Sequence, residues 1–235
     1  MISERAALLV ALTLLLLPID VTSQTLHVAK TSEPIKIDGI LDETSWQTAS
    51  IADNFTQYFP SDTSAAVDQS EIRMTYDDQF IYIGAKLYRS GSQEYVTPSL
   101  RRDFRGAGYD VIAVILDTYK DRTNAFSFGV NPFGVQREGL IAGGGNRTGG
   151  GGGGGRRNSS SVSFDWDNKW FSAAKIYDGY WVAEMAIPFK TIRYKEGLDS
   201  WYVNFIVLIL KPENDLPGLQ FQEISALRVW HFLKK

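Results

Sequence analysis

Residues 116–138 concentrate planar polar side chains behind a charged turn. The turn at residues 119–122 joins two apolar alternating runs, and the second run delivers Asn131, Gln136 and Arg137. Turn residues of this kind set the register of two strands. Amide and guanidinium groups in a row are more than a core needs, because each one must find directional hydrogen-bond partners. The stretch therefore predicts a hairpin that carries polar groups to a ligand.

A second group of candidate residues is Asp165, Trp166, Asp167 and Trp170. An indole ring offers a flat apolar face, and a carboxylate offers hydrogen-bond acceptors. This combination suits a planar or sugar-like ligand. We therefore expect the loop to contribute a binding platform. Packing of either Trp in the core is the alternative.

Three charged side chains complete the set of polar candidates. Arg101 and Arg102 are expected to bind hydroxyl groups, with plain surface charge as the alternative. Glu184 stands among apolar neighbours on an alternating strand, so we expect it to be buried and paired, with Arg193 as the candidate partner.

Catalytic chemistry finds little support in the sequence. A glycosidase needs two carboxylates about 5 to 10 Å apart across a cleft. Asp110, Asp165, Asp167 and Glu184 supply enough carboxylates, but no spacing singles out an acid and a nucleophile. The sequence has no zinc or nucleophile-elbow motif and only two histidines, His27 and His231. A non-catalytic role is favoured.

Asp77 and Asp78 are the candidate metal ligands. Paired carboxylates at a turn are hard oxygen ligands of the kind that Ca²⁺ takes, so half of a calcium site is one interpretation. A solvated turn is the other.

Composition limits the class of partner. The chain has 235 residues, 44% of them hydrophobic, which is enough for a substantial core. The net charge is -3 and the basic residues are scattered among acids, which argues against a nucleic-acid partner.

Residues 1–23 have the form of a signal peptide. Arg5 precedes an apolar run at residues 6–17, and small residues precede the expected cleavage after Ser23. The sequence contains no cysteine, and an exported chain without disulfides suits a bacterium. We therefore expect the protein in the periplasm, or at the cell surface or outer membrane.

Alternating runs and turn signals divide the remainder into strands. The clearest are residues 71–76, 80–88, 110–118, 124–131, 135–142, 180–189 and 201–210. Some ten strands without a strong amphipathic helix predict an all-β fold, an antiparallel β-sandwich.

The expected domain is a single sandwich over residues 24–210. A glycine-rich loop at residues 143–161 interrupts one hairpin connection, and no Lys-Ser/Thr follows it as in a phosphate-binding loop. Residues 211–235 are expected to form an irregular or truncated tail.

Six pieces of the sequence, in order, resemble one family. They are residues 37–43 with Trp46, 76–78 with 81–84, 116–119, 131–136, 165–167 with Trp170, and 181–189 with 192–194. Together they are similar to the family 9 carbohydrate-binding modules, in the version found at the N-terminus of large exported bacterial proteins. The resemblance spans residues 35–205.

The resemblance implies a jelly-roll sandwich related to DOMON folds. It also implies non-catalytic binding of a polysaccharide or oligosaccharide, xylan-like among them, often with structural calcium. Such binding would support carbohydrate catabolism by an associated O-glycosyl hydrolase. In the longer relatives an outer-membrane β-barrel region follows the module. The chain lacks that region, so we expect a truncated form.

Two other functions fit the same resemblance. The domain could dock on an outer-membrane barrel without binding glycan, and the apolar run at residues 206–210 would then be a patch exposed by loss of that partner. Haem binding, known among DOMON-like folds, is the weaker option, because only Met74, Met185 and the two histidines could serve as ligands.

Overall fold

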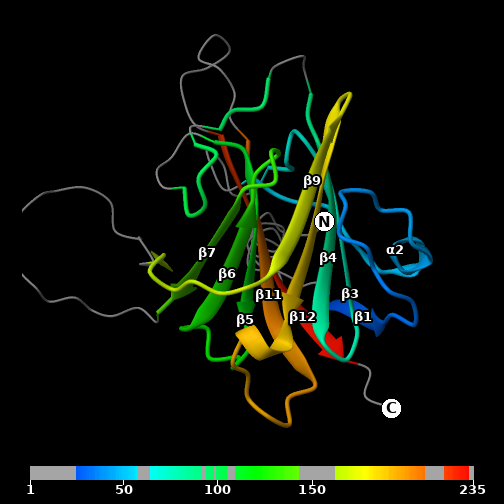
Figure 1. Cartoon of the computed structure of the whole chain (residues 1–235), viewed down its shortest axis with the longest axis vertical. Coiled ribbons are helices and arrows are strands. Elements are labelled where there is room, and N and C mark those ends of the chain that lie inside the picture. Colours follow the sequence, from blue (N-terminus) through cyan, green and yellow to red (C-terminus); the bar gives the residue numbers. More distant parts are fainter. Residues whose placement is uncertain are drawn as a thin grey trace, which may run out of the picture.

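The computed structural model describes residues 25–57, 64–90, 94–97, 99–104, 109–142 and 162–209, and the backbone of residues 220–232. Within these ranges the chain is almost entirely β-structure, arranged as two sheets that form a sandwich (Figure 1). The predicted all-β sandwich is thereby confirmed. In the described part of the chain, no helix is long and apolar enough to cross a membrane.

The first sheet is built around the meander predicted from residues 110–142. In spatial order its strands are β8 (Val162–Ser163), β7 (Gln136–Ile141), β6 (Ala125–Val130), β5 (Val111–Asp117), β11 (Ser200–Ile209) and β12 (Gln220–Phe232). Neighbouring strands in this list are antiparallel. β5 lies between β6 and β11 and is largely buried, as its nearly continuous apolar sequence predicts.

The second sheet contains the predicted hairpin of residues 71–88. Its strands in order are β1 (Thr25–Lys30), β3 (Ser70–Tyr76), β4 (Phe80–Tyr88), β10 (Tyr180–Pro188) and β9 (Phe171–Tyr177), and β2 (Ile51–Ala52) pairs with β3. A 3₁₀ turn, η1 (Phe189–Thr191), follows β10. In Figure 1 the green strands β5 to β7 lie on one side of the sandwich, and β1, β3 and β4 lie on the other.

β1 links the two sheets and departs from the antiparallel prediction. It pairs in parallel with β12 over Thr25 to Val28, and in parallel with β3 at Ala29 and Lys30. An alternating sequence identifies a strand but carries no information about the direction of its neighbours. The sandwich is therefore antiparallel apart from the pairings of this one strand.

Large apolar side chains fill the space between the sheets. The largest fully buried ones include Trp201, Phe55, Phe128 and Phe205. Complete burial of a large apolar side chain stabilises the folded state by about 1.5–3 kcal/mol relative to exposure. Alternate residues of β11 belong to this core, so Val207 and Ile209 are buried parts of a strand. Residues 206–209 are therefore not a continuous exposed patch, which corrects that interpretation for the described part of the run.

The segment before β2 packs on the outer face of the second sheet. Its helix α2 (Thr44–Thr48) buries Trp46, which forms a small cluster with Ile35, Tyr82 and Ala186 (Figure 1). The cluster fixes the N-terminal part of the described chain over β4 and β10.

Glu184 of β10 is fully buried under this segment, as predicted, but its partners differ from the prediction. Its carboxylate accepts hydrogen bonds from the backbone N–H groups of Asp38 and Gly39, at 2.9 and 2.7 Å, and from the Trp46 indole at 3.2 Å. The expected partner, Arg193, lies beyond η1 and is exposed. The pairing of Glu184 with Arg193 was therefore wrong, because backbone donors of a distant segment satisfy the carboxylate.

The C-terminal part also differs from expectation. Residues 211–235 were expected to be irregular, yet residues 220–232 form β12 between β1 and β11. Two neighbouring strands offer unpaired backbone groups there, and such edges can order a segment that has no clear strand pattern of its own. The predicted signal peptide and the glycine-rich loop at residues 143–161 lie outside the described residues. β7 and β8, which flank that loop, pair antiparallel.

Candidate functional site

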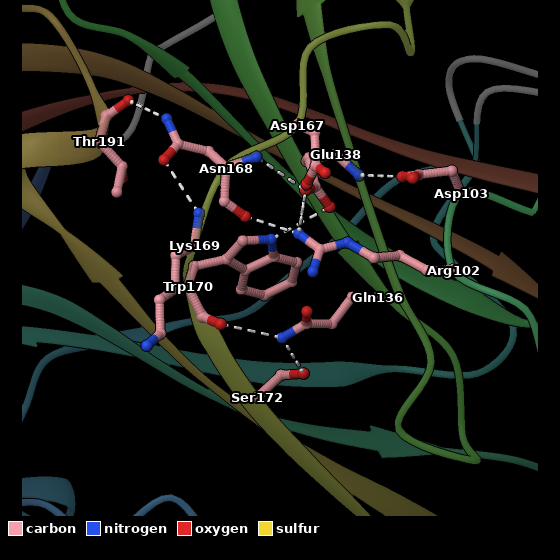
Figure 2. Close-up of polar contacts among 10 residues, drawn as sticks. All are labelled: Arg102, Asp103, Gln136, Glu138, Asp167, Asn168, Lys169, Trp170, Ser172 and Thr191. Atoms are coloured by element: carbon pink, nitrogen blue, oxygen red, sulfur yellow. Dashed lines mark hydrogen bonds and ion pairs between the residues drawn. The ribbon is translucent and has the colours of Figure 1, made fainter.

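Glu138 is the centre of a polar cluster that also contains Arg102, Asp167, Asn168 and Trp170. We call these five residues the Glu138 cluster (Figure 2). The Glu138 side chain is completely buried. Its Oε1 pairs with Arg102 Nη2 and accepts a 3.2 Å hydrogen bond from Asn168 N–H, and its Oε2 accepts one of 3.2 Å from Trp170 Nε1. Three donors thus compensate a buried charge that would otherwise be costly.

Arg102 is the positively charged residue of the cluster, and its side chain reaches the surface. Its side chain is 40% exposed, and Nη2 also donates to the Asn168 carbonyl at 2.6 Å and lies 3.2 Å from Asp167 Oδ1. Burial by itself lowers the pKa of the guanidinium, but the hydrogen bond and charge of Glu138 outweigh it, so the net pKa is raised. The side chain is therefore a permanent, oriented cation.

The loop of residues 99–104 positions Arg102 through its neighbour Asp103. Asp103 has a left-handed backbone (φ 57°), its N–H donates to the Gln136 carbonyl at 3.0 Å, and its side chain accepts from Glu138 N–H at 3.4 Å. Asp is one of the residue types that tolerate this conformation. The loop is thereby attached to the start of β7 next to Glu138.

The loop of residues 164–170 is attached to the same strand from the other side. Gln136 Nε2 donates to the Trp170 carbonyl at 3.2 Å and to Ser172 Oγ at 3.1 Å, and Asn168 Nδ2 donates to the Thr191 carbonyl at 3.0 Å (Figure 2). Alternation in β7 points Gln136 and Glu138 to one face. The cluster therefore joins β7 of the first sheet to the segment that leads into β9 of the second.

The cluster still presents unused polar groups at the surface. All contacts of the Arg102 guanidinium with described residues involve Nη2. Its Nε and Nη1 therefore have no partner within the described part of the protein. Asp167 is 79% exposed and contributes carboxylate acceptors beside the guanidinium. A fixed fork of donors next to an acceptor can bind vicinal hydroxyl groups or a carboxylate, but it offers no nucleophile.

The two predicted Trp platforms lie mainly in the core. Trp170 is 3% exposed and meets the Phe128 ring edge-on at 5.3 Å, and Trp166 is half-buried against Phe126 and Phe128. Trp170 therefore cannot offer a ring face to a ligand, which corrects that expectation. Trp166 keeps part of its surface exposed, and Asp165 beside it is exposed.

Asn131 is a turn residue and not a surface donor. It is fully buried, its Oδ1 accepts from the N–H groups of Phe133 and Val135 at 3.0 and 2.9 Å, and its Nδ2 donates to Thr97 Oγ1 at 2.9 Å. Asn side chains often form such local turns. Its predicted role in binding hydroxyl groups is therefore corrected to a structural one.

The other two predicted arginines, Arg137 and Arg101, lie outside the Glu138 cluster. Arg137 points to the opposite face of β7, where its guanidinium lies over the rings of Phe104, Tyr109 and Phe164 and donates to the Tyr109 hydroxyl. Arg101 is exposed, and its backbone N–H donates to Ser99 Oγ at 3.0 Å. Of the nine predicted saccharide-binding residues, the structure brings Arg102 into contact with Asp167, and Gln136 into contact with Trp170.

Asp77 and Asp78 do not fit a calcium site in this arrangement. Both Asp77 oxygens accept hydrogen bonds, from Gln79 N–H, Phe80 N–H and the Tyr82 hydroxyl, each at 2.7 Å, and Asp78 pairs with Lys30. Among the described residues, no group of three or more His, Cys, Asp or Glu is placed to hold a metal ion. Calcium binding remains a prediction from the resemblance alone.

Glu138, Asn168 and an aromatic depression were not among the predicted features. The depression, of about 670 Å³, is lined by Phe80, Phe189 and Tyr194 at the η1 end of the sandwich. A carboxylate two positions after Gln136 on an alternating strand is a signal that could have identified Glu138. The depression joins segments far apart in sequence, so no local pattern marks it.

Three solved structures have a similar fold. A family 9 carbohydrate-binding module of Caldicellulosiruptor kristjanssonii in complex with glucose is 12% identical with a TM-score of 0.55, covering 89% of this chain and 96% of that one. The same kind of module in complex with cellotriose is 13% identical with a TM-score of 0.55, covering 90% and 95%. A proposed carbohydrate-binding protein of Bacteroides uniformis is 12% identical with a TM-score of 0.60, covering 90% and 100%.

These likenesses show the fold, and they confirm the resemblance of the sequence to family 9 modules at that level. No protein-family model matches the sequence, and no curated protein matches it either.

Proposed function

We propose that the chain is a non-catalytic carbohydrate-binding module whose saccharide site is the exposed side of the Glu138 cluster. The observation that carries the proposal is Arg102. A fully buried carboxylate fixes its Nη2, while Nε and Nη1 have no partner in the described part of the protein. A donor held in place before binding loses little conformational freedom when a ligand arrives.

The chemistry at this surface suits sugar hydroxyl groups. A hydroxyl both accepts and donates, so it can accept from the Arg102 fork and donate to the exposed Asp167 carboxylate. The same loop contributes Trp166, which is partly exposed, as apolar surface for the C–H face of a ring. We expect weak, reversible binding, because this surface is open.

The fold supports the same class of ligand. The family 9 modules of similar fold bind glucose and cellotriose in their complexes. For this chain we propose a polysaccharide or its oligosaccharides, xylan-like among them. We further propose that the protein is exported and holds a partner glycoside hydrolase near its substrate.

Affinity gel electrophoresis tests the proposal. Native gels that contain xylan, cellulose derivatives, mixed-linkage glucan or mannan should retard the wild-type protein on at least one glycan. The variant Arg102→Lys keeps the charge next to Glu138 but removes the fork, and it should migrate as in a glycan-free gel. Arg101→Lys, on the same loop, is the matched control and should remain retarded. Free migration of the wild type in every gel would contradict the proposal.

A further inference from the structure

A separate pocket lies at the C-terminal end of β5, on the outer face of the first sheet. We call it the Tyr202 pocket. Its volume is about 230 Å³, and it is lined among others by Ile115, Ala125, Tyr202, Asn204 and Arg122. Ligand pockets for drug-sized molecules run from about 300 to 1,000 Å³, so this one suits a smaller ligand. Its walls combine apolar side chains with planar polar groups.

Asn204 gives the pocket an unsatisfied hydrogen-bond acceptor. Its Oδ1 is buried and has no partner among the described side chains. Alternation along β11 points Val203 and Phe205 into the core and Asn204 to the outer face, where it lines the pocket. The ladder between β11 and β12 also shifts register at this residue. Such irregularities redirect side chains and are frequent next to functional sites.

The β5–β6 turn forms the rim of the pocket and is held firmly. The Asp117 carboxylate accepts from the N–H groups of Arg122 and Asp121, at 2.8 and 3.3 Å. Asp121 in turn accepts from the Asn124 side-chain amide and from the N–H groups of Asn124 and Thr123, each at 2.8 Å, and these bonds lower its pKa. The rim is therefore organised before any ligand arrives.

Two residues of this turn adopt an uncommon backbone. Lys120 and Arg122 both have φ of 57°, a region that long side chains rarely occupy. Their charged groups lie 5.3 and 5.0 Å from the centre of the Tyr202 ring, and Arg122 Nη2 is 3.4 Å from the Tyr202 hydroxyl. The strained turn thus places a guanidinium and an aromatic ring together at the pocket mouth.

We infer that the Tyr202 pocket binds one hydroxylated ring, such as a single pyranose unit, with a ligand hydroxyl donating to Asn204 Oδ1. The ring packs against the apolar wall of Ile115 and Ala125, and Arg122 binds a second hydroxyl at the rim. The inference takes its ligand class from the proposed function, but it adds a site that shares no residue with the Glu138 cluster. The module then has two points of contact for a saccharide.

The test is a ¹H–¹⁵N NMR titration of the whole chain with D-glucose, D-xylose, D-mannose and D-galactose. The side-chain amide signals of Asn204 should shift in a saturable way with at least one of these sugars. Asn204→Leu, of similar size, should weaken that binding at least tenfold, and Arg102→Lys should leave it unchanged. Tyr202→Phe should retain binding, because the ring is kept.

Asn204→Leu also gives a readout that does not depend on any ligand. An unsatisfied buried acceptor destabilises the free protein, so the variant should melt at a higher temperature than the wild type. A lower melting temperature would show that the amide is already bonded, and it would overturn the inference.

The two sites can fail separately. Binding that is lost in Arg102→Lys but intact in Asn204→Leu overturns the second site and leaves the proposed function standing. Binding lost only in Asn204→Leu supports the Tyr202 pocket and removes the Glu138 cluster as the saccharide site. If no sugar shifts any signal and no glycan retards the protein, both proposals fall.

Discussion

Glu184 and Gly39, 145 positions apart in the chain, are joined by a 2.7 Å hydrogen bond from a backbone N–H group to a fully buried carboxylate. The bond fastens the N-terminal segment to the outer face of β10. A second backbone donor, Asp38 N–H, and the Trp46 indole meet the same carboxylate. One ionisable side chain therefore accepts three of the hydrogen bonds that attach this segment.

Stability should fall as the pH rises through the range in which Glu184 ionises. Burial is the main cause that raises its pKa, to about 7 from 4.5, although the N–H donors act in the opposite direction. Between pH 4.5 and pH 7, Glu184 is protonated in the folded state but ionised in the unfolded state. The free energy of unfolding should therefore decrease by about 3 kcal/mol from pH 4.5 to pH 7. Urea unfolding across this range measures it, and a rise with pH from this residue would contradict the assignment.

Glu184→Gln should be less stable than the wild type near pH 4.5, and the difference should shrink as the pH rises to 7. The amide has a single acceptor oxygen, so its NH₂ group must face one of the three N–H donors. One lost bond and one unsatisfied donor cost about 1–3 kcal/mol. The variant should also lose the dependence on pH between 4.5 and 7. Unchanged dependence in Glu184→Gln would show that another group titrates.

Asn131→Ala should destabilise the fold without abolishing saccharide binding. The change removes three hydrogen bonds of the turn and leaves two backbone N–H groups without their acceptor. We expect a loss of about 1–3 kcal/mol in thermal unfolding. Phe133→Ala, in the same turn but 49% exposed, is the control and should change stability little. Loss of glycan retention by folded Asn131→Ala would restore Asn131 as a binding residue.

Gly39→Ala should cost more stability than Gly179→Ala. Both glycines have a left-handed backbone, with φ of 83° and 76°. A Cβ at Gly39 would meet Lys175 Cβ at 3.0 Å and the Ala174 carbonyl carbon at 3.2 Å, whereas a Cβ at Gly179 meets nothing within 4 Å. Gly179→Ala should lose about 1–2 kcal/mol from the backbone alone. Chemical unfolding of both variants measures the two losses of stability. Equal losses would mean that the segment over β10 moves to accept the new Cβ at no cost, which would contradict the prediction.

Local patterns predicted the strands well because alternation and turn chemistry are local properties. The hairpin of β3 and β4 and the central position of β5 follow directly from their residues. The parallel pairing of β1 with β12 could not be predicted in this way, because it joins opposite ends of the chain.

The candidate site was predicted in outline and not in detail. Arg102 and Asp167 were identified as polar surface groups, and they do lie together. Trp170 and Asn131 were misassigned, because an indole suits a core as well as a ligand, and an Asn amide can hold a turn as well as bind a hydroxyl. Burial decides between these roles, and burial depends on the whole fold.

The central claim is that a saccharide binds through the Arg102 fork. Isothermal titration calorimetry tests it most directly, with oligosaccharides of the glycan that retards the wild type. The account predicts saturable heat for the wild type and for Arg101→Lys, and binding at least tenfold weaker for Arg102→Lys with an unchanged circular dichroism spectrum. Equal affinity of Arg102→Lys and the wild type would contradict it.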